Sequence, residues 1–454
     1  MPPTRTRTAR RGAPPHERSV LPNGLRVVSQ AMPHARSVSV ALFVGVGSRH
    51  EADGEAGLSH MVEHLAFKGT RAYPAPGALS QAIEACGGTV NASTDRELTV
   101  YSSRVPRTRA DRAFEVVAEL VLRPLLRPAD LVAEKPIVVD EIRAYVDSPS
   151  DHVFALFDEL LFGTHPLGRE IAGTPRSVRR TTHADVVGHW RRWYTPEHMV
   201  LAVAGAIDHA TVRRTARSWF DRTGSVDGRA DGRADGVGSG RRARRRKSAG
   251  LSAPRPTSPG SVRVAFRRLT QGNLCLGMPG VSRTHPDRWA LDLLGAVLGD
   301  GMSSRLFVEL RERRSLAYDI GTFATSYADC GTVGIHAGFD PSQSTAIIRA
   351  ALEQLERVVQ DPVPLSELER ARAYTRGRIE LRLEESSAVA AWLGTGESLL
   401  PRILTVEEVV EHLEAVTSDD LLRVARAYLR PSLARIVLLG PFRGRHRVEA
   451  LLAA

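Results

Sequence analysis

The sequence predicts a mixed α and β protein whose two halves share one order of elements. Apolar residues alternate along short segments such as 37–44, which is typical of strands, while longer stretches such as 109–122 have helical spacing. A glycine- and arginine-rich stretch of low complexity separates the halves. A strand, a helix, a strand, long helices and a final strand follow one another on each side of it. We therefore expect two structural duplicates.

An N-terminal tail is expected to precede the first domain. Residues 1–18 are rich in arginine and poor in acidic residues, and we predict a flexible basic tail there. Residues 19–222 are then expected to form the first domain. Within it the sequence predicts a strand at 37–44 and helices at 109–122 and 151–161.

A linker and a second domain complete the predicted organisation. Residues 223–260 combine short repeats containing Asp-Gly, the basic run 241–247 and serine- and proline-rich sequence, so we expect a flexible, cationic linker. Residues 261–454 are expected to form the second domain. The elements predicted in it are a strand at 261–266, a helix at 286–298, a strand at 331–337, a helix at 365–385 and a strand at 434–439.

Ionisable residues cluster in the apolar segment 57–70. His60, Glu63 and His64 form the pattern H-x-x-E-H, an inverted form of a common zinc motif. On a helix, imidazoles four residues apart project from one face and can bind one Zn²⁺. Glu63 lies on the same side, where it can take a proton from a zinc-activated water without being a ligand. Burial among apolar neighbours is costly for these groups unless they have a partner, and a metal is the simplest one.

A third protein ligand is expected, because catalytic zinc usually has three protein ligands and one open position. Glu134 and Glu141 are about two helical turns apart and share a face, whereas Asp140 lies roughly 100° from that face. The same spacing is also typical of an ordinary solvated acidic face, so it leaves both interpretations open.

These motifs together resemble the inverzincin peptidases, the family of pitrilysin, insulin-degrading enzyme and the mitochondrial processing peptidase. H-x-x-E-H is followed far downstream by an E-x6-E pair, Glu134 and Glu141, and the segments 21–25, 87–94 and 193–200 also match the family. The resemblance implies that Glu141 is the third ligand of one zinc ion per chain. It implies that Glu134 supports the site from outside the ligand sphere.

The resemblance also implies a fold and part of a substrate site. Each half is expected to be an α/β sandwich of the α+β class, with an antiparallel-rich sheet and helices packed on one face. Asn91 and Ala92 lie in the segment that resembles the strand lining the family's cleft. They are expected to pair with a peptide substrate, mainly through the main chain.

The second half carries its own match to the family. Arg311 and Tyr318 resemble an R-x6-Y pair that holds substrate backbone near the zinc, and both side chains can donate hydrogen bonds to a carbonyl or an oxyanion. Without this resemblance, the charged residues 309–314 would indicate a solvated helix surface. Family members of this length are implied to form dimers, so we expect a homodimer or a heterodimer with a homologous subunit.

Composition is that of a large globular protein. The chain has 454 residues, of which 42% are hydrophobic and 25% charged. Cys86, Cys275 and Cys330 are widely spaced and form no metal-binding pair, so we expect buried thiols and a cytoplasmic location. No apolar stretch approaches the length of a transmembrane helix and the first residues contain no signal-peptide core, so no membrane association is expected.

The positive charge of the chain raises the question of nucleic-acid binding. The net charge is +11, but only 6% of residues are aromatic, and much of the excess charge lies in the tail and the linker. A nucleic-acid interface needs a basic face with stacking aromatic side chains. Binding of nucleic acid is therefore not expected.

We interpret the chain as a zinc metalloendopeptidase or oligopeptidase acting on peptides or unfolded segments. His60, His64 and Glu141 would hold the zinc, and Glu63 would act as the general base. Two alternatives remain: a subunit of a heteromeric processing peptidase, and a non-catalytic scaffold whose basic linker binds nucleic acid. An intact H-x-x-E-H argues against the scaffold.

Overall fold

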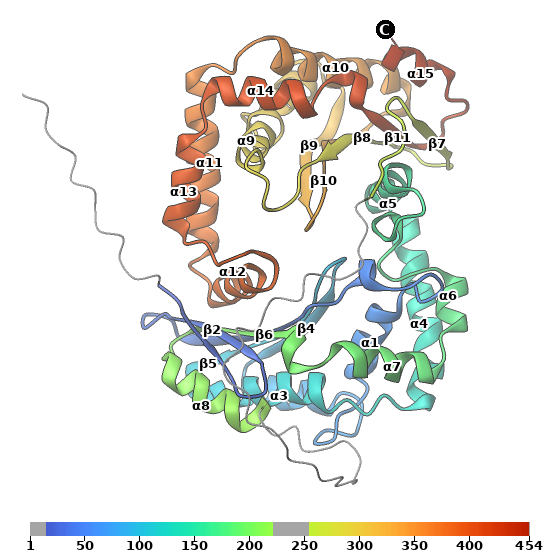
Figure 1. Cartoon of the computed structure of the whole chain (residues 1–454). Coiled ribbons are helices and arrows are strands. Elements are labelled where there is room, and N and C mark those ends of the chain that lie inside the picture. Colours follow the sequence, from blue (N-terminus) through green and yellow to red (C-terminus); the bar gives the residue numbers. More distant parts are fainter. Residues whose placement is uncertain (1–14, 221–253, 454) are drawn as a thin grey trace, which may run out of the picture.

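A computed structural model describes residues 15–220 and 254–453, which are arranged around two β-sheets (Figure 1). Most of the predicted basic tail and of the predicted linker lies outside the described residues. The described end of the linker is hydrogen-bonded to the first half: Thr257 donates from its backbone N–H to Leu161 O at 3.0 Å and from its hydroxyl to Leu160 O at 2.8 Å.

The first sheet is formed by the first half of the chain. Its strands are β1 (Glu17–Val20), β2 (Arg26–Ala31), β3 (Ser37–Val44), β4 (Thr89–Thr94), β5 (Thr99–Pro106) and β6 (Met199–Gly205). The strand order is β1-β2-β6-β3-β5-β4, and β2 with β6 is the one parallel pair in it. Alternation along β3 places Val40 and Leu42 in one hydrophobic core and Ala41 and Phe43 in another, so both faces of the sheet are buried.

Most helices of the first half cover one face of this sheet. The helices are α1 (Leu58–Ala66), α2 (Ala78–Glu84), α3 (Ala110–Leu122), α4 (Pro128–Asp147), α5 (Pro149–Phe162), α6 (Pro175–Arg180), α7 (His183–Trp193) and α8 (His209–Phe220), with short 3-10 turns η1 (Ser48–His50), η2 (Arg107–Arg109), η3 (Pro166–Gly168) and η4 (Pro196–His198). Met61 of α1, Phe114 of α3 and Val138 of α4 share a core with the sheet. Helix α5 does not contribute to that core.

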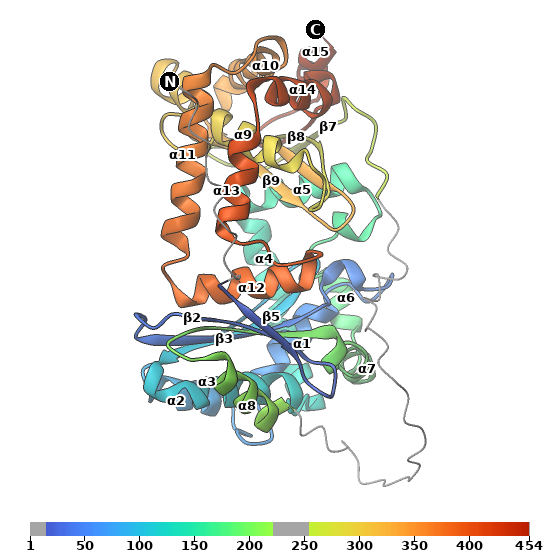
Figure 2. The ribbon, with the colours of Figure 1, turned by 60° about the vertical axis from the view of Figure 1, so that its left-hand side comes forward.

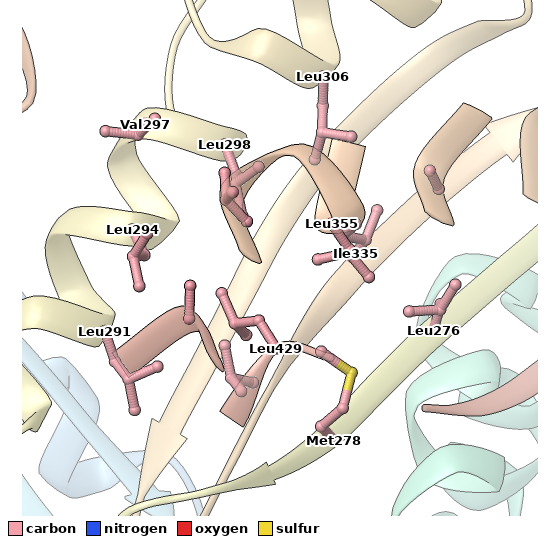
Figure 3. Packing of buried hydrophobic residues seen from close by; sticks show 14 of the residues in the cluster. Leu276, Met278, Leu291, Leu294, Val297, Leu298, Leu306, Ile335, Leu355 and Leu429 are labelled. Atoms are coloured by element: carbon pink, nitrogen blue, oxygen red, sulfur yellow. The ribbon is translucent and has the colours of Figure 1, made fainter. Parts of the chain in front are cut away.

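The second sheet is formed by the second half of the chain. Its strands are β7 (Val262–Phe266), β8 (Gly272–Gly280), β9 (Ala317–Ser326), β10 (Gly331–Phe339) and β11 (Arg435–Gly440). The order is β7-β11-β8-β10-β9, with β7 and β11 parallel. Figure 3 shows Leu276 and Met278 of β8 and Ile335 of β10 packed with leucines of the neighbouring helices in one core.

The second half contains a similar set of helices. They are α9 (Arg288–Leu298), the π-helix η5 (Phe307–Arg313), α10 (Ser344–Gln360), α11 (Leu365–Arg382), α12 (Ser386–Leu399), α13 (Val406–Ala415), α14 (Ser418–Tyr428) and α15 (His446–Ala453), with 3-10 turns η6 (Pro341–Gln343) and η7 (Pro431–Leu433). Among the helices of the described residues, none combines the length and the apolar composition needed to cross a bilayer.

The two halves are structural duplicates, as the order of elements predicts. When β1 is left out, the strand orders match one to one, with the last strand of each half parallel to its first. Helix α1 corresponds to the segment that contains α9 and η5, and the long helices α4 and α11 correspond to each other. The α+β class and the antiparallel-rich sheets are confirmed.

The halves also exchange one helix each, which the sequence did not predict. Helix α12 of the second half packs on β3 and β6 of the first sheet, and helix α5 of the first half packs on β8 and β11 of the second. Figures 1 and 2 both show α12 lying on the lower sheet. Within residues 15–220 and 254–453, each sheet thus carries its own helices on one face and one helix from the other half on the opposite face.

A buried ionic cluster joins the halves near their junction. Arg49 of η1, whose side chain is fully buried, pairs with Glu97 at 2.7 Å and with Asp329 at 2.9 Å. Arg283 pairs with the other oxygen of Glu97 at 2.8 Å. Because Asp329 and Arg283 come from the second half, these ion pairs connect the two halves. Removing Arg49 would take away one of the two partners of Glu97 and the arginine that pairs with Asp329, and breaking ion pairs of this kind is costly.

Candidate metal centre

Helix α1 is fixed at its N-terminus by a buried carboxylate. Glu51 accepts the backbone N–H of Gly57 at 2.9 Å and that of Ser59 at 2.7 Å, groups that a helix leaves without intrahelical partners. Gly57 has φ 91°, and a Cβ there would lie 2.4 Å from Ala172 O, so glycine is required at this entry to the helix. The register of α1 is thereby set by contacts outside the motif.

The structure brings together the three predicted metal ligands. His60 and His64 project from the same face of α1, with their Nε2 atoms 3.2 Å apart. Helix α4 packs beside α1 and places Glu141 opposite them. Glu141 Oε1 lies 3.5 Å from His60 Nε2, and Glu141 Oε2 lies 3.3 Å from His64 Nε2. We call His60, His64 and Glu141 the three-ligand cluster.

The potential ligand atoms lie close enough together for one zinc ion. Zinc bonds to imidazole nitrogen and carboxylate oxygen are about 2.0–2.2 Å long, so ligand atoms at the corners of a tetrahedron lie about 3.3–3.5 Å apart. The two Nε2 atoms are 3.2 Å apart, and the nearest Glu141 oxygen lies 3.5 Å from His60 Nε2 (Oε1) and 3.3 Å from His64 Nε2 (Oε2), so the separations are of this size but involve two different oxygens of Glu141. Burial, and the neighbouring His64, lower the pKa of His60 to about 4. His60 is therefore a neutral imidazole near pH 7, which is the form that binds metal.

A carboxylate outside the cluster orients one of the ligands. Glu134, which is 3% exposed, accepts a hydrogen bond from His64 Nδ1 at 2.9 Å. This bond fixes the ring and leaves Nε2 free to bind a metal. Lys68 Nζ lies 2.6 Å from the other oxygen of Glu134 and compensates its buried charge. Glu134 therefore lies where the resemblance implies, beside the ligands.

Glu63 also lies on α1, where strand β4 holds it. Thr94 Oγ1 donates a hydrogen bond to Glu63 Oε2 at 2.5 Å. Burial raises the pKa of Glu63 above its usual value, although the bond from Thr94 and the nearby His64 act against the shift. A carboxylate whose pKa moves toward neutrality can both accept and return a proton.

Comparison with known proteins assigns the chain to a family. The family model described as insulinase, peptidase family M16, matches residues 26–175, and the model described as the peptidase M16 inactive domain matches residues 180–374. An uncharacterized zinc protease of Streptomyces coelicolor is 35% identical over 428 residues, which cover 94% of this chain and 90% of that protein. The chain belongs to the insulinase family of peptidases.

Other relatives in this family extend over the same length. An uncharacterized zinc protease of Bacillus subtilis is 30% identical over 419 residues, covering 92% of this chain and 97% of that protein. The crystal structure of a protease from Helicobacter pylori superposes with a TM-score of 0.82 at 24% identity, covering 94% of this chain and all of that one, so it shares the fold. The names of the curated relatives imply zinc as the metal.

Asn91 and Ala92 lie on the free edge strand of the first sheet. Strand β4 is last in the strand order and contacts α1. Along β4 the partly buried residues, among them Ala92 and Thr94, alternate with exposed ones. The Ala92 N–H donates to Asn91 Oδ1 at 2.9 Å. Apart from this N–H, the outward main-chain groups of an edge strand beside the three-ligand cluster are available for an added strand.

Arg311 and Tyr318 are not brought to the cluster. Arg311 lies on η5 with its guanidinium 4.8 Å from the centre of the Phe307 ring, and Tyr318, half exposed at the start of β9, donates to Gln271 at 2.8 Å. In Figure 1, β9 lies in the upper half and α1 in the lower half. Strand β9 is an edge strand of its sheet and the counterpart of β4.

Sequence reasoning missed three residues of the site. Lys68 follows His64 by four residues, so helical spacing alone could have placed it near that side of α1. Thr94 lies two residues after Ala92 and therefore on the same face of β4, a signal that was available once β4 was placed beside α1. Glu51 precedes α1 by a loop, and no periodicity connects it with the helix that it caps.

Proposed function

We propose that the protein is a zinc-dependent endopeptidase or oligopeptidase with one zinc ion per chain. The observation that carries the proposal is the three-ligand cluster, in which one potential ligand atom from each residue lies within 4.8 Å of the others. The names of the relatives support the metal and the reaction class. Peptides or unfolded segments are the proposed substrates, because an edge strand pairs with extended chain.

In the proposed reaction, each residue of the site has a separate role. Zinc at the cluster would supply a Lewis acid that polarises a carbonyl and lowers the pKa of a water. Glu63 accepts a proton from the attacking water and then donates it to the leaving amine. Thr94 occupies one oxygen of Glu63, which leaves the other to face the water. Glu134 holds His64 in the tautomer with an unprotonated Nε2.

Substrate would be positioned by β4. An extended peptide that adds to the free edge of this strand, at Asn91 and Ala92, would run along α1. Thr94 belongs to the same strand, so the strand that receives the substrate also positions the base.

The second half would complete the site in a dimer. Arg311 and Tyr318 are both exposed and lie away from the three-ligand cluster of their own chain. We therefore propose that this pair holds substrate at the zinc site of a partner subunit, either a second copy or a homologous chain. We also propose a reducing, cytoplasmic location, consistent with the free cysteines Cys86, Cys275 and Cys330.

Two matched substitutions test the roles of the glutamates. Glu63→Gln should keep zinc and lower the turnover of a peptide substrate by about 10²-fold or more, because the base is lost and the ligands remain. Glu141→Gln should weaken zinc binding itself. Asp140→Asn is the control, because Asp140 is exposed and pairs with Arg143. If Glu63→Gln lost zinc while Glu141→Gln kept it, the assignment would be wrong.

Mixing subunits tests the position of Arg311. Activity should partly recover when Glu63→Gln chains are combined with Arg311→Ala chains, since one site of each mixed dimer keeps both groups. If activity did not recover although subunit exchange had been demonstrated, the proposal that Arg311 acts between subunits would be contradicted.

A further inference from the structure

A second candidate site lies in the second half, away from the three-ligand cluster. The N-terminal end of α9, the loop after α12 and helix α13 border an open cavity of about 540 Å³. Pro286, Arg288, Trp289, Leu404, His412 and Ala415 line it. This volume is in the range of small-molecule sites, which are usually about 300–1,000 Å³. None of the residues assigned to the peptidase site borders it.

The cavity contains an arginine, Arg288, that forms no ion pair with any described residue. Across residues 15–220 and 254–453, no carboxylate forms an ion pair with Arg288, and its buried Nε has no hydrogen-bond partner. Its Nη1 donates to the carbonyl of Arg283 at 2.5 Å. Burial lowers the pKa of Arg288, against the favourable effect of nearby Asp292. A partly buried cation in this state gains from an anion that enters the cavity.

The other charged groups of the cavity wall are already paired. Asp287 accepts from Arg423 at 2.8 Å and from the hydroxyl of Tyr428 at 3.2 Å. Arg402 donates to Glu408 at 2.5 Å. Arg288 is therefore the charge best placed to bind an anion.

Aromatic and apolar side chains form much of the remaining wall. The Arg288 guanidinium lies 3.8 Å from the centre of the Trp289 ring, and Trp289 stacks on His412 with centroids 4.8 Å apart and planes inclined by 11°. Stacking on Trp289 keeps the guanidinium in one orientation. Pro286 and Leu404 add apolar surface. A ligand that fits this wall needs an apolar body as well as a negative group.

We propose that this cavity binds a carboxylate attached to an apolar or aromatic body, with Arg288 holding the carboxylate. Two sources share this chemistry, namely a free small acid and the C-terminal residue of a peptide. The planar guanidinium suits a carboxylate because two parallel N–H groups can meet its two oxygens.

Calorimetric titration of the full-length protein tests the proposal with a matched pair of probes. N-acetyl-L-phenylalanine should bind with a dissociation constant of about 1 mM or lower, and N-acetyl-L-phenylalaninamide roughly tenfold more weakly, because the amide lacks the charge. Arg288→Gln should weaken binding of the acid by a similar factor. Arg376→Gln should leave it unchanged, since Arg376 is exposed on α11 and pairs with Glu380. Ala415→Trp, at an exposed position of the cavity wall, should block binding without disturbing the core.

The source of the ligand is resolved by a third probe. The third probe is a tripeptide ending in phenylalanine, titrated into Glu63→Gln protein, which should not cleave the peptide. If peptide C-termini are the ligands, the tripeptide should bind more tightly than the free acid. If small acids are the ligands, it should bind no more tightly. The proposal would be overturned if the acid and the amide bound equally well. It would also be overturned if the acid still bound to both Arg288→Gln and Ala415→Trp proteins, a result that would point to the zinc site instead.

Discussion

The exchange of helices between the halves can be tested at a single glycine. Gly394 lies in α12 against the first sheet, and a Cβ at this position would be 1.9 Å from Cε2 of Phe43 on β3. Phe43 is itself buried and has little room to move. Gly394→Ala should therefore force α12 away from the sheet. Overpacking of this kind typically costs about 1–3 kcal/mol of the free energy of unfolding.

Gly377 offers a matched control on the neighbouring helix. It lies inside α11, and a Cβ there would meet nothing within 4 Å. Both substitutions should gain about 1 kcal/mol from the higher helix propensity of alanine. The difference between the two variants therefore isolates the clash, and Gly394→Ala should be less stable than Gly377→Ala by roughly 1–3 kcal/mol. Urea unfolding followed by circular dichroism measures this difference. Equal stabilities would mean that α12 does not pack tightly on β3.

Three further substitutions test the surroundings of the site. Glu134→Gln places an amide beside Lys68 and weakens the support of His64, so zinc affinity measured by competition with a chelator should fall about 10–100-fold; an unchanged affinity would refute the role of Glu134. Thr94→Val should lower kcat by roughly tenfold at unchanged zinc content, and Thr94→Ser should restore it, because the hydroxyl alone positions Glu63; a loss shared by both variants would indicate a packing effect. Glu51→Gln should lower the free energy of unfolding by about 1–3 kcal/mol, because the NH2 group of the glutamine side chain must then face a backbone N–H of the helix. A melting temperature equal to that of the parent would contradict this capping role.

The parts of the fold that follow from local pattern could be predicted from the sequence. Alternation in 37–44 predicted β3 at its observed bounds, and helical spacing placed α3 and α11 within a few residues. The position of His60 and His64 on one face follows from their spacing of four residues on a helix. Glu141 needed the resemblance to a family, since spacing alone did not distinguish a ligand from a solvated acid.

Features that depend on the relation between the halves could not be predicted. The apolar residues of α5 would have the same spacing whichever sheet the helix packed on. Nothing in the local sequence therefore indicates that α5 covers the second sheet. The crowding of Gly394 against Phe43 likewise joins residues far apart in the sequence. The position of Arg311 and Tyr318 relative to the zinc site depends on how whole halves, or whole subunits, are arranged.

The central claim is that His60, His64 and Glu141 bind one zinc ion. Anomalous diffraction at the zinc absorption edge, from crystals of the full-length protein grown with zinc, tests it most directly. We predict one strong peak bounded by His60 Nε2, His64 Nε2 and a carboxylate oxygen of Glu141. Protein that cleaves peptides but shows no zinc peak at this position, or a peak held by other residues, would contradict the account.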